Sequence, residues 1–210
     1  MPKRSDRLSR STGRFALPTL LVVYSEGETE TRALQALKQA WRVPNALIEC
    51  IPNAGDPSKI LEKAKERVKA DRTCACWVVF DKDKHDRWAE AINDFHQAKK
   101  KRSNLHLGIS TPCIELWGIL LFRDHKSEIS HPEAQSALRK EDPSYHHKDN
   151  PYIDAKKVEA GHEAAAERAR ELRKIAEQNV TETGDAMARY GNPTTYFDLV
   201  VEALRSRRRT

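Results

Sequence analysis

Acidic side chains follow three apolar segments of this chain, at places where a β-strand would end. Glu26 and Glu30 follow the first segment, Asp81 and Asp83 follow the third, and Glu115 lies shortly after the fourth. The carboxyl ends of parallel strands share one edge of an α/β sheet, so these side chains should converge. Clustered carboxylates repel one another unless a cation neutralises them, and such hard oxygen ligands suit Mg²⁺ or Mn²⁺. The spacing therefore predicts a divalent-metal site.

Each acidic residue also has a purely structural interpretation. Glu30 and Glu115 would lie in the first turn of a helix, where the helix dipole favours a carboxylate. Asp81 and Asp83 would then be turn or helix-capping residues. The convergence of all of them favours a site, and Gly27 fits a turn where the backbone approaches a ligand.

The segments that position these residues alternate between two periodicities. Short apolar runs at about 17–24, 47–51, 75–80 and 105–109 predict buried strands, and a stretch with helical spacing of apolar residues follows each run. Four such units predict an α/β fold with about four parallel strands covered by helices on both faces. Thr111 is predicted to be the N-cap of the fourth helix, with Pro112 as its first residue.

The rest of the chain predicts a helical extension of this core. We expect a short helix at 131–140, a polar loop at 141–153, a long helix capped by Asp154 that runs to about 180, and a final helix opened by Asn192 and Pro193. The chain then divides into a disordered basic tail (1–15), an α/β domain (16–125) and a helical extension that packs on it (126–210) and ends in a basic tail.

The net charge of +6 over 210 residues is unevenly placed. Residues 1–14 and the last six residues each carry +4, which leaves −2 for the body between them. Basic tails favour contact with nucleic acid or a partner, although a solubilising role explains them equally well. We see neither a membrane-spanning run nor a signal peptide and expect a cytoplasmic protein. Four cysteines without a C-x-x-C pair predict reduced, buried thiols and argue against a zinc site.

The acidic motifs also carry a resemblance to known proteins. E-G-x-x-E at 26–30 and D-x-D at 81–83, each after a predicted strand, resemble the Toprim fold of topoisomerases, primases and OLD-type nucleases. With T-P-C-I-E-L-W at 111–117 and N-P-T-T at 192–195, residues 18–204 are similar to the RloB-like family, which has an N-P-C-F-E-L-W type of motif at the first place. This chain departs from that motif at Thr111 and Ile114.

The resemblance implies a Toprim-like catalytic domain over 16–125 that hydrolyses phosphodiester bonds of DNA or RNA with Mg²⁺ or Mn²⁺. Glu26, Asp81 and Asp83 would bind the metal, Glu30 would be a further ligand or support one, and Glu115 would be another ligand or orient the helix that follows it. RloB-like proteins accompany restriction and abortive-infection loci. An effector of anti-phage defence is therefore implied, with an ABC- or AAA-type ATPase partner and possible oligomers within that complex.

Other residues are candidates for contacts with substrate. Lys82, Lys84 and His85 adjoin the D-x-D motif and would face the scissile phosphate. In the polar loop, His146 and His147 are candidates for touching substrate or partner, and Tyr145 and Tyr152 are candidates for stacking on bases.

Two other functions remain open at this point. A Toprim-like fold can serve as a non-catalytic regulatory or assembly subunit, although such a subunit gains nothing from mutually repelling carboxylates. A strand ending in D-x-D also begins phosphatases of the haloacid dehalogenase type, with Asp81 as the nucleophile. That scheme gives no task to the E-G-x-x-E segment and needs a later acidic motif that the sequence lacks.

Overall fold

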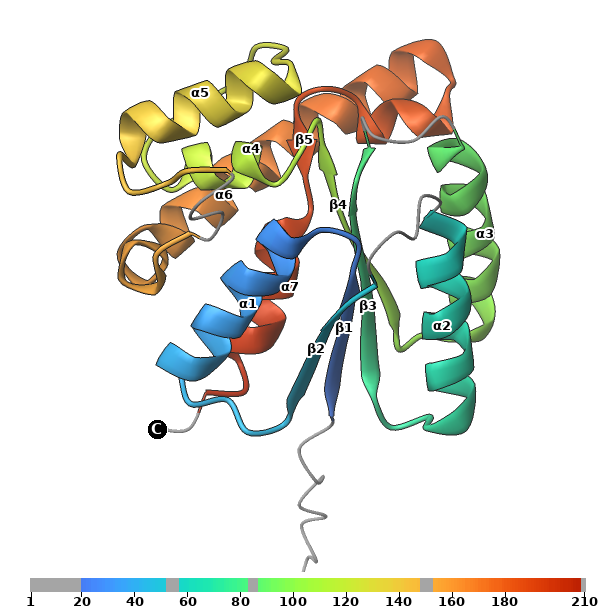
Figure 1. Cartoon of the computed structure of the whole chain (residues 1–210). Coiled ribbons are helices and arrows are strands. Elements are labelled where there is room, and N and C mark those ends of the chain that lie inside the picture. Colours follow the sequence, from blue (N-terminus) through green and yellow to red (C-terminus); the bar gives the residue numbers. More distant parts are fainter. Residues whose placement is uncertain (1–19, 52–56, 83–86, 148–152, 209–210) are drawn as a thin grey trace, which may run out of the picture.

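A five-stranded sheet with the strand order β2-β1-β3-β4-β5 forms the centre of the computed structural model (Figure 1). The structure describes residues 20–51, 57–82, 87–147 and 153–208. Four strands are parallel, and the short β5 pairs antiparallel with β4. The strands are β1 (Leu21–Ser25), β2 (Ala46–Cys50), β3 (Ala75–Asp81), β4 (Leu105–Thr111) and β5 (Thr194–Thr195). The predicted α/β class with four parallel strands is confirmed.

Helices cover both faces of this sheet. Figure 1 shows α1 and α7 on one side and α2 and α3 on the other, with α4, α5 and α6 gathered near the carboxyl ends of the strands. The helices are α1 (Glu28–Ala40), α2 (Pro57–Ala70), α3 (Trp88–Lys101), α4 (Glu115–Leu120), α5 (His131–Glu141), α6 (Ala155–Thr183), the 3-10 helix η2 (Ala186–Tyr190) and α7 (Phe197–Arg205).

The alternation of side chains along the strands produces two apolar cores. Leu21 and Val23 of β1 belong to the cluster that includes residues of α1 and α7, whereas Val22 belongs to the cluster with residues of α2 and α3. Successive side chains of a strand point to opposite faces, so a strand between two helical layers must be apolar on both. This explains why the first strand is a continuous apolar run, and all five of its residues are buried.

The predicted helical extension packs against the core of the sheet. Leu138 of α5 and Val158 and Ala165 of α6 belong to the same apolar cluster as Leu21 of β1. The cap of α6 is formed as predicted, because the Asp154 carboxylate accepts hydrogen bonds from the backbone amides of Lys156 and Lys157. The division at residue 125 stays a prediction, and the predicted tail at 1–15 lies outside the described residues.

The predicted starts of two helices are wrong. Thr111 is the last residue of β4 rather than an N-cap, because it pairs with Thr194 of β5 and its hydroxyl donates to the carbonyl oxygen of Tyr190 at 3.1 Å. The next helix begins only at Glu115. Asn192 and Pro193 likewise do not open the final helix, since β5 intervenes and α7 begins at Phe197. A two-residue strand is too short to give a period in the sequence.

An ion pair fixes the return of the chain to the sheet. The Arg173 guanidinium of α6 binds both carboxylate oxygens of Asp198, at 2.6 and 2.9 Å, and also donates to the carbonyl oxygen of Thr195 at 2.6 Å. The Asp198 side chain is only 3% exposed. This forked contact ties the long helix to β5 and to the start of α7.

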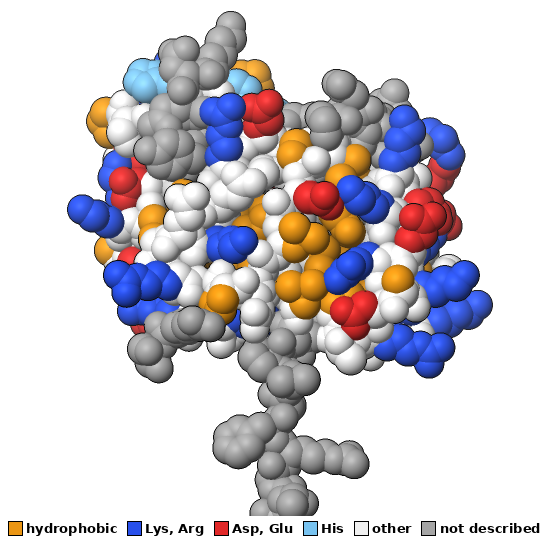
Figure 2. Space-filling model, turned by 60° about the horizontal axis from the view of Figure 1, so that its bottom comes forward, with side chains coloured by type: hydrophobic (Ala, Val, Ile, Leu, Met, Phe, Trp, Pro, Cys, Tyr) orange, Lys and Arg blue, Asp and Glu red, His pale blue; other side chains and the backbone are white. Residues whose placement is uncertain are grey.

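Basic side chains line a hollow at the amino ends of the strands, opposite the acidic motifs. Its volume is about 510 Å³, and Lys69 and Arg72 from the end of α2 face Lys101 and Arg102 from the end of α3. Figure 2 shows this end of the molecule, with Lys and Arg side chains gathered along the right. Cations at helix C-termini are stabilised by the helix dipole, which gives these residues a structural role. None of the helices described is long and apolar enough to cross a membrane.

Candidate active site at the carboxyl edge of the sheet

The first acidic motif occupies the turn between β1 and α1. The backbone amide of Glu26 donates to the carbonyl oxygen of Val79 in β3 at 3.1 Å, which anchors the turn to the neighbouring strand. The hydroxyls of Ser25 and Thr31 lie 2.5 Å apart, and Thr31 also donates to the carbonyl oxygen of Gly27 at 2.9 Å. These hydrogen bonds hold the start of α1 against the end of β1, so the backbone of the E-G-x-x-E motif is fixed at both ends of the turn.

Glu30 is folded back over this turn. It lies in the first turn of α1, where the helix dipole stabilises a carboxylate, yet it is only 2% exposed. A β-carbon added at Gly27 would lie 2.8 Å from the Glu30 carboxyl carbon. The φ of Gly27 is −95°, which any residue adopts. The absence of a side chain at Gly27 therefore leaves room for the Glu30 carboxylate in its present position, whereas the backbone conformation of Gly27 does not require glycine.

Glu26 and Glu30 both affect the pKa of the Cys50 thiol. Cys50, at the end of β2, donates to the carbonyl oxygen of Glu26 at 3.4 Å. Burial raises the pKa of the Cys50 thiol, and the charges of Glu30 and Glu26 raise it further. A hydrogen bond from Thr31 acts in the opposite direction.

Asp81 ends β3 at the same edge of the sheet. It is 3% exposed and pairs in register with Ser110 of β4. Asp83, Lys84 and His85 lie outside the described residues, so the second half of the D-x-D motif is not placed. Carboxylates as deeply buried as Asp81 and Glu30 need compensation by hydrogen bonds or a cation, because burial disfavours the charged form.

Lys82 points to different partners from those predicted. Its ammonium donates to the carbonyl oxygen of Tyr190 at 2.9 Å and lies 4.0 Å from the ring centre of Trp88. Burial lowers the pKa of Lys82, with the charge of Asp185 opposing that effect. The prediction that Lys82 faces a phosphate is therefore wrong for this conformation, since its donor groups connect β3 to η2 and α3.

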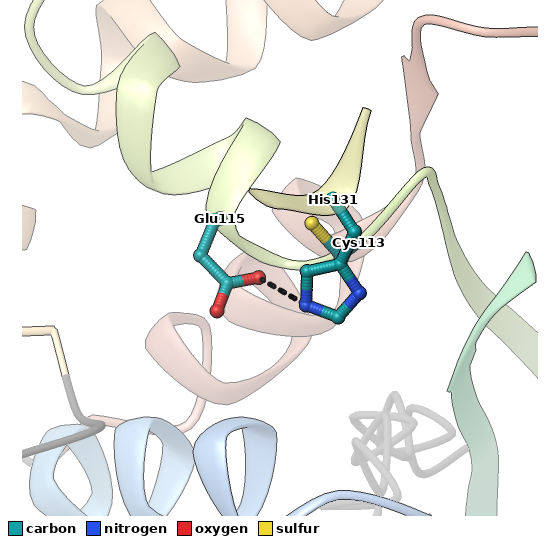
Figure 3. A group of neighbouring side chains, drawn as sticks. All are labelled: Cys113, Glu115 and His131. Atoms are coloured by element: carbon teal, nitrogen blue, oxygen red, sulfur yellow. Dashed lines mark ion pairs between the residues drawn. The ribbon is translucent and has the colours of Figure 1, made fainter. Parts of the chain in front are cut away.

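Glu115 lies in the first turn of α4 and is 1% exposed. The Tyr145 hydroxyl donates to its Oε1 atom, and His147 Nδ1 lies 3.4 Å from the same atom. His131 Nε2 lies 3.9 Å from Oε2 (Figure 3). Burial acts to raise the pKa of Glu115, but hydrogen bonds from Tyr145 and Cys113 outweigh it, so that the pKa is lowered and the carboxylate stays charged.

Tyr145 binds Glu115 and is affected by the charge of Asp81. Burial raises the pKa of Tyr145, and the negative charges of Glu115 and, more weakly, Asp81 raise it further. The two acidic residues therefore act on one phenol, as expected for neighbouring strand ends. Tyr145 is only 1% exposed, so the prediction that it stacks on bases is wrong. Tyr152 lies outside the described residues.

Sequence reasoning missed most of the partners of Glu115. His131 was assigned only to a helix, and His147 was predicted to touch substrate or partner from a polar loop; no spacing rule links either residue to position 115. His146 is exposed, as expected for a contact residue, but nothing places a substrate beside it. The one available signal was the pair of histidines beside Tyr145 in an otherwise polar segment.

The described carboxylates fit a hard divalent cation. Glu26, Glu30 and Asp81 present only oxygen donors at one edge of the sheet, and Gly27 leaves the space that the Glu30 carboxylate fills. Mg²⁺ is commonly held by one or two carboxylates together with water and substrate phosphate, so this number of side chains is sufficient.

Ligands of α/β proteins bind at the carboxyl ends of the strands, and acidic residues at that edge are typical of proteins that bind divalent metals. Comparison with protein families gives a match to the model described as RloB-like protein, over residues 21–204. The match covers most of the chain, and the protein belongs to the RloB-like family. Comparisons with curated proteins and with solved structures found no match.

Proposed function

We propose that this RloB-like protein is a divalent-metal-dependent nuclease. The observation that carries the proposal is that three carboxylates follow the carboxyl ends of two adjacent parallel strands, β1 and β3: Glu26 and the nearly buried Glu30 after β1, and the nearly buried Asp81 at the end of β3. A divalent cation next to carboxylates favours their charged forms, and oxygen donors are the ligands that Mg²⁺ prefers.

Each acidic residue has a role in the proposed reaction. Glu26, Asp81 and Asp83 would hold Mg²⁺ or Mn²⁺, and Glu30, fixed over Gly27, would complete or support that set. When bound, such ions activate a water and stabilise the leaving oxygen in phosphodiester hydrolysis. Glu115 is held away from bulk solvent by Tyr145, so in this proposal it shapes the end of the site instead of contacting water directly.

The proposed biological role follows from the family resemblance. RloB-like proteins resemble small Toprim nucleases of restriction and abortive-infection loci, and we propose an effector of anti-phage defence that works with an ABC- or AAA-type ATPase. The substrate is DNA or RNA. The basic tails and the basic hollow at the far end of the sheet support contact with a polyanion or an acidic partner.

Nuclease assays with matched carboxylate variants test this proposal. The full chain, alone and with its ATPase partner, is incubated with duplex DNA, single-stranded DNA and RNA in Mg²⁺ or Mn²⁺. Glu26→Gln and Asp81→Asn should abolish cleavage, with a loss of at least about a hundredfold. Glu62→Gln removes an exposed carboxylate that pairs with Lys65 at 2.6 Å and should cleave like the wild type.

Three outcomes would overturn the assignment. Cleavage that survives both substitutions would place the site elsewhere. Phage resistance that persists with Asp81→Asn would favour a non-catalytic regulatory or assembly subunit. Hydrolysis of a small phosphomonoester that is lost in Asp81→Asn but kept in Glu26→Gln would favour the phosphatase alternative, because that chemistry uses the aspartate alone as nucleophile.

A further inference from the structure

A second group of metal-ligating side chains surrounds Glu115. Cys113, Glu115 and His131 each offer one ligand atom, and these three atoms all lie within 4.8 Å of one another. Cys113 and Glu115 are 0% and 1% exposed, and the His131 side chain is 20% exposed. Figure 3 shows the carboxylate and the imidazole turned toward each other, with the sulfur beside them. The three come from the end of β4, the start of α4 and the start of α5.

The separations are close to those of ligands around one ion. Zinc bonds of about 2.0–2.3 Å in a tetrahedral arrangement place ligand atoms about 3.5 Å apart. The Oε2 atom of Glu115 and Nε2 of His131 are 3.9 Å apart, and Nδ1 of His147 is 3.4 Å from Oε1 of Glu115.

Two of these atoms have no hydrogen bond among the residues that the structure describes. They are Oε2 of Glu115 and Nδ1 of His147, and both atoms are buried. A buried carboxylate oxygen without a donor is costly, by about 1–3 kcal/mol or more for a charged group. A cation held by Cys113, Glu115 and His131 would provide the partner that the Oε2 atom of Glu115 lacks.

The chemistry of the donors selects the kind of ion. Sulfur, imidazole nitrogen and one carboxylate oxygen together suit Zn²⁺ and similar transition metals, whereas Mg²⁺ prefers oxygen alone. Contacts around the group orient two of the ligands. The Tyr145 hydroxyl holds Glu115, and the capping box of Ser130 and Glu133 fixes the start of α5, which carries His131. The Gln135 amide lies 2.9 Å from Nε2 of His131, so a metal ion bound at that nitrogen would displace it.

We propose that Cys113, Glu115 and His131 form a three-residue binding site for a Zn²⁺-type transition-metal ion. Glu115 also lies at the end of the carboxylate site of the proposed nuclease, but the binding of this second ion does not depend on that function. Binding exchanges the thiol proton of Cys113, which is released to solvent, for a metal–sulfur bond. The ion connects the start of α4 to the start of α5, and so holds the elements beside Asp81 in place.

Titration of the metal-stripped full chain with Co²⁺ and Zn²⁺ tests the site. We expect one equivalent of tightly bound ion, a sulfur-to-cobalt charge-transfer band, displacement of Co²⁺ by Zn²⁺, and a rise in Tm with bound Zn²⁺. Cys113→Ser should remove the charge-transfer band, and His131→Gln should weaken Zn²⁺ binding by at least about tenfold. The His131 variant changes a partly exposed side chain, so it remains informative if Cys113→Ser folds poorly.

Matched variants separate this site from other thiols, imidazoles and carboxylates. Cys76→Ser removes a buried thiol of the other apolar core, and His146→Gln removes an exposed imidazole; both should bind Co²⁺ and Zn²⁺ as the wild type does. Asp81→Asn should also keep the charge-transfer band, even though it should abolish cleavage. Absence of stoichiometric binding by the wild type, or equal binding by His131→Gln, would overturn the proposal.

Discussion

The Tyr145 hydroxyl donates a hydrogen bond to the carboxylate of Glu115, 30 residues earlier in the chain, and both side chains are almost completely buried. The bond joins the segment after α5 to the start of α4. Hydrogen bonds to a charged group contribute more than neutral ones, and a buried charge that loses its donor keeps its desolvation cost.

Tyr145→Phe should therefore destabilise the fold by about 1–3 kcal/mol, measured by urea unfolding in the presence of a chelator. Tyr190→Phe is the matched control, because the Tyr190 hydroxyl meets the neutral ring of His96 at 2.9 Å. Its loss should be smaller, at about 1 kcal/mol. Equal losses in the two variants would show that the charge of Glu115 does not depend on Tyr145.

Gly27→Ala should weaken binding of Mg²⁺ or Mn²⁺ by about tenfold while the fold is retained. The added methyl group would displace the Glu30 carboxylate, which lies over this position. Calorimetric titration measures the affinity. Gly184→Ala serves as the control: it should reduce stability, since Gly184 has a φ of +71°, but leave metal affinity unchanged. Unchanged affinity in Gly27→Ala would contradict the role of Glu30.

Gly161→Ala should cost about 1–3 kcal/mol of stability, although alanine is the better helix former. A β-carbon at this position of α6 would lie 2.7 Å from the carbonyl oxygen of Leu121, just after α4. Backbone cannot move aside as a flexible side chain can, so the two segments must separate. Ala160→Gly, at the exposed neighbouring position, measures the helix-propensity contribution alone, and a stabilised Gly161→Ala would refute the close contact.

Arg173→Met should destabilise the fold by about 3–5 kcal/mol, because it leaves the buried Asp198 carboxylate without its guanidinium partner. Arg173→Lys should restore only part of this loss, since an ammonium cannot bind both carboxylate oxygens in a fork. Guanidinium unfolding measures both variants. Arg32→Met removes an exposed pair with Glu28 and should change stability by less than about 0.5 kcal/mol.

The stability of the wild type should fall as the pH decreases from about 6.5 to about 4, in part because of His106. Burial lowers the pKa of His106 to about 4, helped by the charges of Lys99 and Arg207, and the ring stacks on Trp77 at 4.8 Å. In this pH range the unfolded chain binds a proton that the folded chain does not, so acid favours unfolding. The contribution is below about 3 kcal/mol, because the ring keeps some contact with solvent.

His106→Gln should flatten that part of the pH profile, compared by urea unfolding at pH values of about 7 and about 5. Replacement of the exposed His146 by glutamine should leave the profile of the wild type unchanged. A His106 variant with the same slope as the wild type would assign the acid sensitivity to other groups.

Strand and helix alternation was predictable from the sequence because each buried strand is apolar on both faces. Val22 and Val23 point to opposite faces of the sheet and are both buried, so the uninterrupted apolar run is enough to predict a strand covered on both sides. Asp81 and Glu30 could be assigned to one edge for the same reason: topology converts their positions after the strands into proximity.

The rest depended on contacts between residues distant in the sequence. Thr111 was misplaced because its pairing with Thr194 outweighs the local preference of Thr-Pro for a helix start. The partners of Glu115 escaped prediction because His131 and Tyr145 reach it through tertiary packing, and neither has a spacing that marks it. Local sequence patterns identified the acidic residues, but not the side chains that bind them, such as Tyr145 at Glu115.

The position of β5 has a consequence for synthesis of the chain. Until residues 194–195 have left the ribosome, β4 has an uncovered edge, and on that side its backbone groups at Ser110 and Thr111 have no strand to pair with. Such edges invite pairing with other chains. A polypeptide that stops before residue 194 should therefore aggregate through the edge of β4 that faces away from Asp81.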